Sequence, residues 1–537
     1  MDTMIYTGME AKHRKCAMLH GQRSGNNWYA RSKTHELSLP IQGDTIPVYS
    51  RDKPYPYLGF MLNMNGDAYL EQRNGLITQF HTNMQRISQS PLPIAAKIEA
   101  INTILISKLS FYFANMHFPD NILYQIESCI VYEVRQWLAL NNSSTRSCMF
   151  LPRKHGGLGI LKASTLYYAK RVSFLLSVLN SDDQQVRESA RYTFHLHMSK
   201  RKVPVANDDD PNFGGYTVGS DGRIVKQSKV NWARSDFVEL NELCMRLNIQ
   251  LELRNDTFHI VIDDGEGVSI SFSDYRAVYA ELKRVRIDND LEYFEKLKNQ
   301  GKLRREAMRH ADMSCSNQHL INLDISDKLT QFVAKGRLQL LETQAMLAIY
   351  YPHIHDKHCP ACGFSPDTTS HIMSSCPSFR NMYIERHDRA VNHLFDQIKR
   401  VKTSEGIVLL NNKCITGQRF GTYEFVAEHN KPDITIIDHQ NKQTFIIEVS
   451  HPYDLFIEDC YKHKFDKYMP LCLDVQGTGH RCTIIVLVIG ALGLVHRRYV
   501  SGLQRIGFSK TVAKAIAKYL SLSSMIGSRR IWRRRRR

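Results

Sequence analysis

The chain has 537 residues, 43% of them hydrophobic and 23% charged, and its 71 Lys and Arg against 53 Asp and Glu give a net charge of +18. This composition is that of a globular protein with about three or four domains, and it excludes wholesale disorder and collagen-like or coiled-coil repeats. The longest apolar run, residues 483–495, is shorter than the roughly 20 residues of a membrane-spanning helix. We therefore interpret it as a buried strand and expect no membrane partner.

The charge and the cysteines indicate the partner and the compartment. An excess of positive charge favours a polyanion as partner. The N-terminus lacks the apolar segment of a secretory signal, and the 12 Cys are scattered except for one tight cluster. Scattered cysteines are typical of reduced thiols inside the cell. We expect a nuclear protein, or a cytoplasmic one before its import.

The first part of the chain combines an irregular start with long helices. Residues 1–50 are short and irregular segments, and a turn-rich piece follows at residues 52–60. Within residues 61–180, apolar residues recur at intervals of three and four, which predicts helices at 68–88, 94–113, 121–140 and 162–179. Residues 181–324 follow as a polar linker and a small α+β insert, with strands expected at 248–253, 257–262 and 268–272.

The second part mixes helices and strands. One amphipathic helix is expected at 325–350, within a helical linker of residues 325–358, and another helix runs from 378 to about 399. Apolar segments then predict strands at 423–427, 434–437, 444–449 and 482–489, with a helix near 457–470. This order indicates an α/β domain at residues 378–520. The fold class expected for the whole chain is α+β and multidomain.

The last segment, residues 521–537, is a basic tail in which seven of the last nine residues are Arg. Such a run is expected to contact phosphate groups or to act as a nuclear address. The alternative is a solvated, disordered tail without a specific role.

Three cysteines and a histidine in residues 359–376 have the spacing of a zinc knuckle. Two residues separate Cys359 from Cys362, eight precede His371, and four more precede Cys376. Zinc binds four thiolate or imidazole ligands in a tetrahedron, so these residues would fill a structural site that unfolds without its metal. The alternative is four residues that are buried by coincidence. Histidines just upstream are further candidate ligands: His353, His355 and His358.

Two acidic residues lie at the open end of a predicted hairpin. The apolar segments 434–437 and 444–449 flank a polar turn centred between residues 440 and 441, so Asp433 faces Glu448. Directly opposed residues lie about 4.5–5.5 Å apart. Two carboxylates this close repel each other unless they share a cation, and Mg²⁺ prefers such oxygen ligands. An ordinary hairpin with acidic residues at its mouth is the alternative.

A helix predicted just downstream carries Lys464 and Lys467, which lie three residues apart and share a face. A lysine beside two acids can orient an attacking water or stabilise the charge that develops during the reaction. Two acids, a lysine and a metal ion are the parts needed to hydrolyse a phosphodiester. A solvated basic helix is the alternative.

The hairpin resembles the core of the restriction-endonuclease-like PD-(D/E)xK nucleases, with Pro432 and Asp433 followed after 14 residues by Glu448. Ser450 occupies the position of that family's usual lysine. The chain is more similar to the endonucleases of early-branching non-LTR retrotransposons, especially those of ribosomal-DNA type, in which the lysine lies on the next helix. Their order of zinc knuckle, Arg-His helix, hairpin and lysine-tyrosine helix is matched by these residues: Arg386, His387, Asp433, Glu448, Lys464, Lys467 and Tyr468.

This resemblance implies roles for individual residues. Asp433 and Glu448 would bind Mg²⁺ and act in catalysis together with Lys464 and Lys467. The cysteine and histidine cluster would bind Zn²⁺. Contacts with nucleic acid are expected from four residues: Lys431, Arg386, His387 and Tyr468.

The N-terminal half resembles the same family. Residues 55–60 and 151–160, with the helices between them, resemble the end of the palm and the thumb of its reverse transcriptase, so residues 1–60 are assigned to the palm and 61–180 to the thumb. Lys15-Cys16 resembles the segment after the polymerase's paired aspartates, and residues 333–352 resemble the linker before the knuckle. In all, the resemblance covers about residues 1–180 and 325–525.

The resemblance also implies that the polymerase's own aspartates precede the first residue of this chain. The Asp-Asp pair in a strand-like setting, Asp263-Asp264, follows the thumb-like region and is interpreted as a hairpin turn. We therefore expect no polymerase activity from this chain alone. It is expected to be the C-terminal part of a longer polyprotein, a truncated copy, or a host gene derived from one.

Three functions remain open at this point. The first is a Mg²⁺-dependent endonuclease that nicks a DNA target to prime reverse transcription, with the element RNA, the missing polymerase half or a second copy of the chain as further partners. The second is a nucleic-acid-binding remnant without catalysis. The third is an accessory subunit that needs a partner palm. The sequence favours the first, because both acids and both lysines are present.

Overall fold

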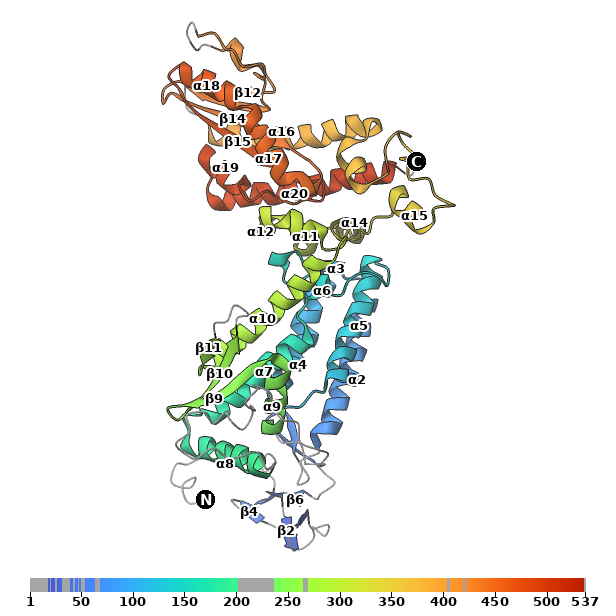
Figure 1. Ribbon diagram of the computed structural model, residues 1–537, viewed down its shortest axis with the longest axis vertical. Coiled ribbons are helices and arrows are strands. Elements are labelled where there is room, and N and C mark those ends of the chain that lie inside the picture. The colour runs from blue at the N-terminus through green and yellow to red at the C-terminus, as the bar shows by residue number, and fades with distance from the viewer. Residues whose placement is uncertain are drawn as a thin grey trace. The chain divides into compact units, whose positions relative to one another are not determined.

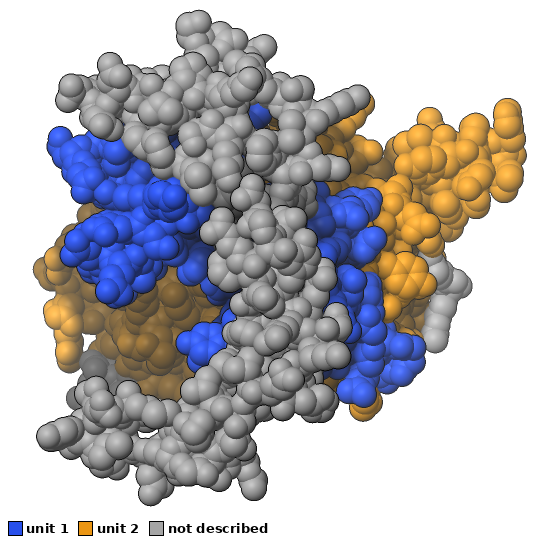
Figure 2. Space-filling view, turned by 90° about the horizontal axis from the view of Figure 1, so that it is seen from below, with its two compact units in different colours: residues 1–89, 105–127, 166–279 blue, residues 90–104, 128–165, 280–537 orange. Residues whose placement is uncertain are grey.

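The computed structural model describes residues 54–62, 68–200, 236–263, 269–402, 406–418, 420 and 423–535, with the backbone of short strands between residues 18 and 49. The chain is a mixed α/β protein that divides into two compact units, coloured in Figure 2. Lys15-Cys16, Asp264 and the last two residues lie outside the described part, so the interpretations placed on them stay predictions. No helix in the described ranges is long and apolar enough to cross a membrane.

The first unit comprises residues 1–89, 105–127 and 166–279. Its helices are α2 (Ala68–Gln89), α4 (Ser107–Phe113), α7 (Ala163–Leu179, which begins in the other unit), α8 (Gln184–Lys200) and α9 (Asp236–Leu247). The helices α2, α4 and α7 lie in segments where the apolar periodicity predicts helices. The helices α8 and α9 lie in the segments predicted as a polar linker and an α+β insert, where no helix is predicted.

The strands of this unit form small sheets. The predicted insert is an antiparallel sheet of β9 (Ile249–Arg254), β10 (Thr257–Asp263) and β11 (Ser269–Phe272), in the order β11-β10-β9. Its three strands are therefore confirmed to within two residues. The hairpin β7 (Tyr55–Tyr57) and β8 (Phe60–Leu62) precedes α2. Six further strands lie upstream: Met18–Leu19, Gly21–Ser24, Asn27–Ala30, Leu39–Ile41, Asp44–Ile46 and Val48–Tyr49.

An ionic network lies in the core of the first unit. Glu239 on α9 pairs with Arg171 on α7 at 2.9 Å and with His117 at 2.6 Å, and it also accepts a hydrogen bond from the Tyr167 hydroxyl. Only 7% of the Glu239 side chain is exposed. These contacts connect segments that lie far apart in the sequence.

The second unit comprises residues 90–104, 128–165 and 280–537. Before its sheet it contains these helical elements: α3 (Ile94–Ala100), the π-helix η2 (Ile101–Ile106), α5 (Asp120–Leu138, shared with the first unit), α6 (Ser147–Phe150), α10 (Tyr275–Lys296, also shared), α11 (Lys302–Glu306), α12 (Met313–Ser316) and α13 (Gln318–Ile321). The helix predicted at 94–113 is therefore a continuous run of α3, η2 and α4.

The second unit contains a four-stranded sheet in the order β12-β13-β14-β15, and Figure 1 labels three of its strands, β12, β14 and β15. Its strands are β12 (Ile407–Asn411), β13 (Ile434–Asp438), β14 (Gln443–Ser450) and β15 (Arg481–Val488). The strand β13 is antiparallel to both neighbours, and β14 and β15 are parallel. The inner strand β14 is therefore held by backbone hydrogen bonds on both sides.

Helices cover both faces of this sheet. Because side chains alternate along a strand, Ile436, Phe445 and Ile447 pack into one core with α16 (Arg380–Val401), α19 (Tyr499–Ile506) and α20 (Lys510–Arg534). Ile437 and Ile446 pack into the opposite core with α17 (Ile457–Lys467) and α18 (Met469–Gly477). The side chain of Glu448 shares the face of Ile446, toward α17.

The helix predicted at 325–350 is wrong as a single element. It consists of α14 (Asp327–Arg337) and α15 (Gln344–Tyr350). Gln339 has φ +57° in the break, and Thr343 caps α15 by accepting from the N–H of Met346. The N–H of Gln344 donates to the buried Asp367 at 2.6 Å. Turn and capping contacts therefore interrupt an apolar pattern that is continuous in sequence.

The strand predicted at 423–427 is also wrong. The backbone N–H groups of Val426 and Ala427 donate to the Asp474 carboxylate at 2.9 and 2.8 Å, so a side chain takes the place of a neighbouring strand. The edge of the sheet is instead β12, for which no strand is predicted from the sequence.

The basic tail expected at 521–537 does not form a separate segment: up to Arg535 it is part of the second unit. The helix α20 runs on to Arg534, and Ser521, Ser524 and Ser528 on it are buried. Arg535 forms an ion pair of 2.7 Å with Asp367, and both side chains are buried. The part of this segment up to Arg535 is thus built into the second unit.

Candidate functional site

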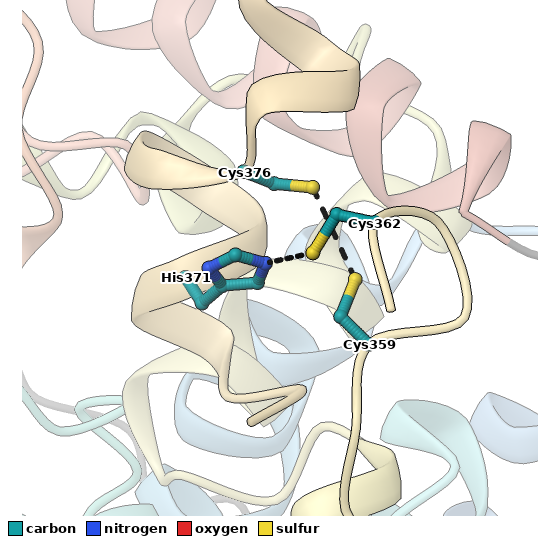
Figure 3. Close-up of side chains that lie close together, drawn as sticks. All are labelled: Cys359, Cys362, His371 and Cys376. Carbon is teal, nitrogen blue, oxygen red and sulfur yellow. Dashed lines mark hydrogen bonds between the residues drawn. The ribbon is translucent and has the colours of Figure 1, made fainter. Parts of the chain in front are cut away.

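The predicted zinc ligands lie together (Figure 3). The ligand atoms of Cys359, Cys362, His371 and Cys376 are all within 4.8 Å of one another. Cys362 Sγ lies 3.4 Å from His371 Nε2, and Cys359 Sγ lies 3.9 Å from Cys376 Sγ. Bonds of roughly 2.0–2.3 Å to zinc separate tetrahedral ligands by about 3.3–3.8 Å, so the donor set and spacing fit zinc. The four residues form a Cys₃His cluster that can bind a metal such as zinc.

Local backbone geometry brings these ligands together. Gly363 has φ +71° and its N–H donates to the carbonyl of Cys359 at 2.7 Å, which closes the turn between the first two cysteines. His371 begins the π-helical turn η6 (His371–Ser375), and the 3₁₀ turn η7 (Pro377–Phe379) directly follows Cys376. Backbone N–H groups, first that of Phe364, lower the pKa of the Cys362 thiol and so favour the thiolate that binds metal.

Two of the three upstream histidines are engaged elsewhere. His355 Nδ1 lies 3.1 Å from Gln344 Oε1, and His358 Nδ1 lies 2.6 Å from Asp356 Oδ1. Neither belongs to the Cys₃His cluster, and His353 does not belong to it either.

The paired acids lie at one end of the β13–β14 hairpin, with the predicted register. Ile434 pairs with Ile447, so the next pair outward is Asp433 and Glu448. Asp433 Oδ2 accepts a hydrogen bond of 2.7 Å from the N–H of Val449. The predicted turn and register are therefore confirmed, and they hold two carboxylates side by side.

Charged neighbours surround this pair. Lys464 on α17 donates to Glu448 Oε1 at 2.5 Å, and 5% of the Glu448 side chain is exposed. Burial, together with the charge of Asp433, raises the pKa of Glu448, although Lys464 opposes the shift. Burial alone would lower the pKa of His387, but hydrogen bonds and charges from Asp433 and Asp388 outweigh it and raise the pKa to about 9. His387 is then a cation at neutral pH, with Nε2 at 3.3 Å from Asp433.

Of the other residues predicted for this site, Tyr468 lies at the acid pair and Lys467 does not. The Tyr468 hydroxyl donates to the carbonyl of Lys431 at 3.3 Å and also interacts with Glu448, and both burial and Glu448 raise the pKa of Tyr468. Lys467 lies with Nζ 4.8 Å above the Tyr468 ring rather than on either acid. Lys464 is therefore the lysine that the structure places on the acid pair.

Arg386 does not face solvent. It is 4% exposed, and its guanidinium donates to Ser528 Oγ and to the carbonyls of Met373 and His451 at 2.7–3.1 Å. Burial lowers the pKa of Arg386 to about 10, so it stays charged at pH 7. The expected contact with nucleic acid is not supported by this position, because the side chain is bound to protein acceptors in α20, η6 and the segment after β14.

A cavity beside Asp433 was not anticipated from the sequence. Its volume is about 160 Å³, and its lining includes three asparagines, Asn392 on α16 and Asn411 and Asn412 at the end of β12. The Asn-Asn pair directly after an apolar segment is the signal that could have located it, but without β12 in the sheet nothing connected it to Asp433.

The fold and the clusters define a mixed α/β protein with a Cys₃His cluster that can bind a metal and a carboxylate pair in which Glu448 is buried and Asp433 is partly exposed. No family model matches the chain. Over 123 residues, 23% of the chain, it is 28% identical to the retrovirus-related Pol polyprotein from type-2 retrotransposable element R2DM of Drosophila melanogaster. Over 129 residues, 24% of the chain, it is 26% identical to the retrovirus-related Pol polyprotein from type-1 retrotransposable element R2 of Popillia japonica.

These matched segments span 11% and 26% of the two relatives' own lengths. The similarities support an origin of the chain in a non-LTR retrotransposon polyprotein. The activities of those longer polyproteins come to this chain only as proposals.

Proposed function

We propose that the second unit contains a Mg²⁺-dependent DNA endonuclease, which nicks target DNA to prime reverse transcription. The observation that carries this proposal is the Asp433–Glu448 pair, with Lys464 on one acid and His387 on the other. The similarity to two retrotransposon polyproteins supports an origin in such an element, and the resemblance of the hairpin residues to the endonucleases of these elements implies the nicking activity.

The carboxylates are arranged to share a cation. Glu448 Oε2 is buried and has no hydrogen-bond partner among the described residues, and the contacts of Asp433 go through Oδ2, which leaves Oδ1. Carboxylate oxygens of this kind are the ligands that Mg²⁺ prefers. A bound Mg²⁺ would supply an activated water and stabilise negative charge on a phosphodiester.

The neighbouring side chains have separate tasks in this proposal. The N–H of Val449 fixes one oxygen of Asp433, and Lys464 fixes one oxygen of Glu448, so each acid presents its other oxygen. The cationic side chains Lys464 and His387 offset the negative charge that a scissile phosphate adds to the site. The Cys₃His cluster would be structural, because all four of its positions are protein ligands.

The test is nicking of supercoiled plasmid by the zinc-loaded full chain, in Mg²⁺ and in EDTA. Asp433→Asn keeps the volume of the side chain and an oxygen for the N–H of Val449, but it removes the negative charge. We expect nicking in Mg²⁺ only, and a rate about 100-fold or more lower in Asp433→Asn. Plasmid retention on a gel should stay close to that of the wild type.

The matched control is Asp396→Asn, the same exchange at an exposed position on α16. It should nick at the wild-type rate. If folded wild-type protein retains DNA but does not nick it, the chain is a nucleic-acid-binding remnant and the endonuclease proposal is wrong. If Asp433→Asn nicks as fast as the wild type, cleavage belongs to another site or a contaminant.

A further inference from the structure

The cavity next to Asp433 lies outside the carboxylate pair itself. It is lined by His387, Asp388, Val391 and Asn392 from α16, by Asn411 and Asn412 at the end of β12, and by Asp433. All of these residues belong to the second unit. A group bound here would touch Asp433 from the side of β12 and α16, whereas Lys464 approaches Glu448 from α17.

Asn412 is held in an unusual conformation at the mouth of this cavity. Its φ is +51°, in the left-handed region that few residues other than glycine and asparagine adopt. Its N–H donates to the carbonyl of Asp433 at 2.8 Å, so the backbone of the acid and that of Asn412 are joined directly. The position of this residue relative to Asp433 is therefore fixed by the backbone.

The three asparagine side chains differ in which of their hydrogen-bonding atoms already have a partner. Asn411 Nδ2 donates to Asn392 Oδ1 at 3.2 Å, so these two side chains brace each other. The side-chain amide of Asn412 has no hydrogen-bond partner within the described ranges and keeps both its donor and its acceptor. An amide free on both atoms can form the paired hydrogen bonds by which asparagine recognises adenine.

Charge and size decide what class of group fits. The cavity is lined by two carboxylates, Asp388 and Asp433, against one histidine, His387, so its acidic side chains outnumber the basic one and disfavour a phosphate, whereas a neutral base carries donors and acceptors without a charge. The volume of about 160 Å³ is below the roughly 300–1,000 Å³ of pockets for drug-sized ligands, which favours a single ring system.

We propose that this cavity binds one nucleobase of the target DNA beside the phosphodiester addressed by Asp433 and Glu448, and that Asn412 reads this base, with adenine as the best fit. The proposal rests on the proposed endonuclease function and adds a base preference to it. A bidentate contact of this kind discriminates by about 5- to 150-fold against the wrong base.

The test is a binding selection that does not depend on cleavage. Full-length, zinc-loaded protein in Ca²⁺ is given DNA duplexes with a randomised central segment, and the retained duplexes are sequenced. The wild type should enrich adenine at one position by about fivefold or more. Asn412→Gly, which keeps the left-handed backbone, should lose this enrichment. Asn412→Asp should move the preference toward cytosine, because a carboxylate accepts from its amino group.

Asn255→Gly is the matched control, since Asn255 also has a positive φ, of +48°, in the turn between β9 and β10 of the other unit. It should keep the adenine preference. The proposal is overturned if the wild type shows no adenine preference, or if Asn412→Gly retains it. Nicking in Mg²⁺ is measured separately. Selection of adenine without nicking would reject the nuclease but keep the base contact. Nicking without an Asn412-dependent preference would reject the base contact but keep the nuclease.

Discussion

At the scale of single residues, Arg386 shows that a charged side chain has a structural role when it is buried among protein acceptors. Its sequence position, next to His387 and ahead of the hairpin, is that of a nucleic-acid contact in the family it resembles. In the structure it joins three elements of the second unit through Ser528, Met373 and His451. Nothing in the local sequence distinguishes the two roles, because the acceptors come from segments up to 142 residues away.

Arg386→Ala should therefore reduce stability rather than only DNA binding. Removing a buried guanidinium leaves its acceptors unpaired and costs about 3 kcal/mol of unfolding free energy. Urea unfolding followed by circular dichroism measures this. Arg389→Ala on the same helix is the control, because its pair with the exposed Glu385 is worth less than about 1 kcal/mol. A stable Arg386→Ala protein with weakened DNA binding would instead favour the nucleic-acid contact.

At the scale of elements, the segment that contains the Cys₃His cluster is connected to the helix α20. The ligands lie on a tight turn and on η6, and Arg386 and Arg535 tie this region to the helix α20 and its end. A segment as short as residues 359–376 has too small a core of its own, so bound metal should account for much of its order.

Cys362→Ser should release the metal and loosen residues 359–400. Metal analysis should find about one zinc per wild-type chain and much less in the variant. Hydrogen exchange should speed up in η6 and the start of α16, with a smaller effect at the end of α20. Cys414→Ser, at an exposed cysteine outside the cluster, should change neither. If metal analysis of the folded wild-type chain finds no zinc, the zinc assignment of the cluster is wrong.

The elements also show what could be predicted from the sequence. The β13–β14 register follows from local information alone, a polar turn between two apolar segments, and the knuckle follows from ligand spacing. The break between α14 and α15 depends on Asp367, and the missing strand at 423–427 depends on Asp474. These carboxylates satisfy backbone groups from 23 to 48 residues away, which periodicity does not reveal. The Asn412 cavity needed the same kind of long-range pairing, between β12 and β13.

At the scale of the whole molecule, each of the two units is stabilised internally by a different kind of interaction. The second has a sheet covered on both faces by apolar cores. The first relies in part on the buried network around Glu239, which links α7, α9 and His117. Burial would raise the pKa of Glu239, but hydrogen bonds from His117 and the charge of Arg171 outweigh it and lower the pKa to about 2.

The first unit should consequently lose stability in acid. Because the pKa of Glu239 is lower in the folded state than the ordinary value of 4.5, its contribution is present above about pH 4.5 and is lost as the pH falls toward 2. The full contribution is on the order of 3 kcal/mol. Glu239→Gln should be less stable than the wild type at pH 7, and urea midpoints of the two should converge toward pH 3. A constant difference across this range would contradict the lowered pKa.

The stability cost of the carboxylate pair affects which mutations the site would accumulate. Glu448 lies on an inner strand, and its charge is buried next to a second negative charge. Such an arrangement costs folding free energy, so replacing either acid by its amide would relieve repulsion without disturbing the sheet. Mutational drift judged by stability alone would therefore tend to erase one acid while the fold survived. Both acids are present in this chain, and under the proposed endonuclease function it is their chemistry, not their contribution to stability, that would oppose this loss.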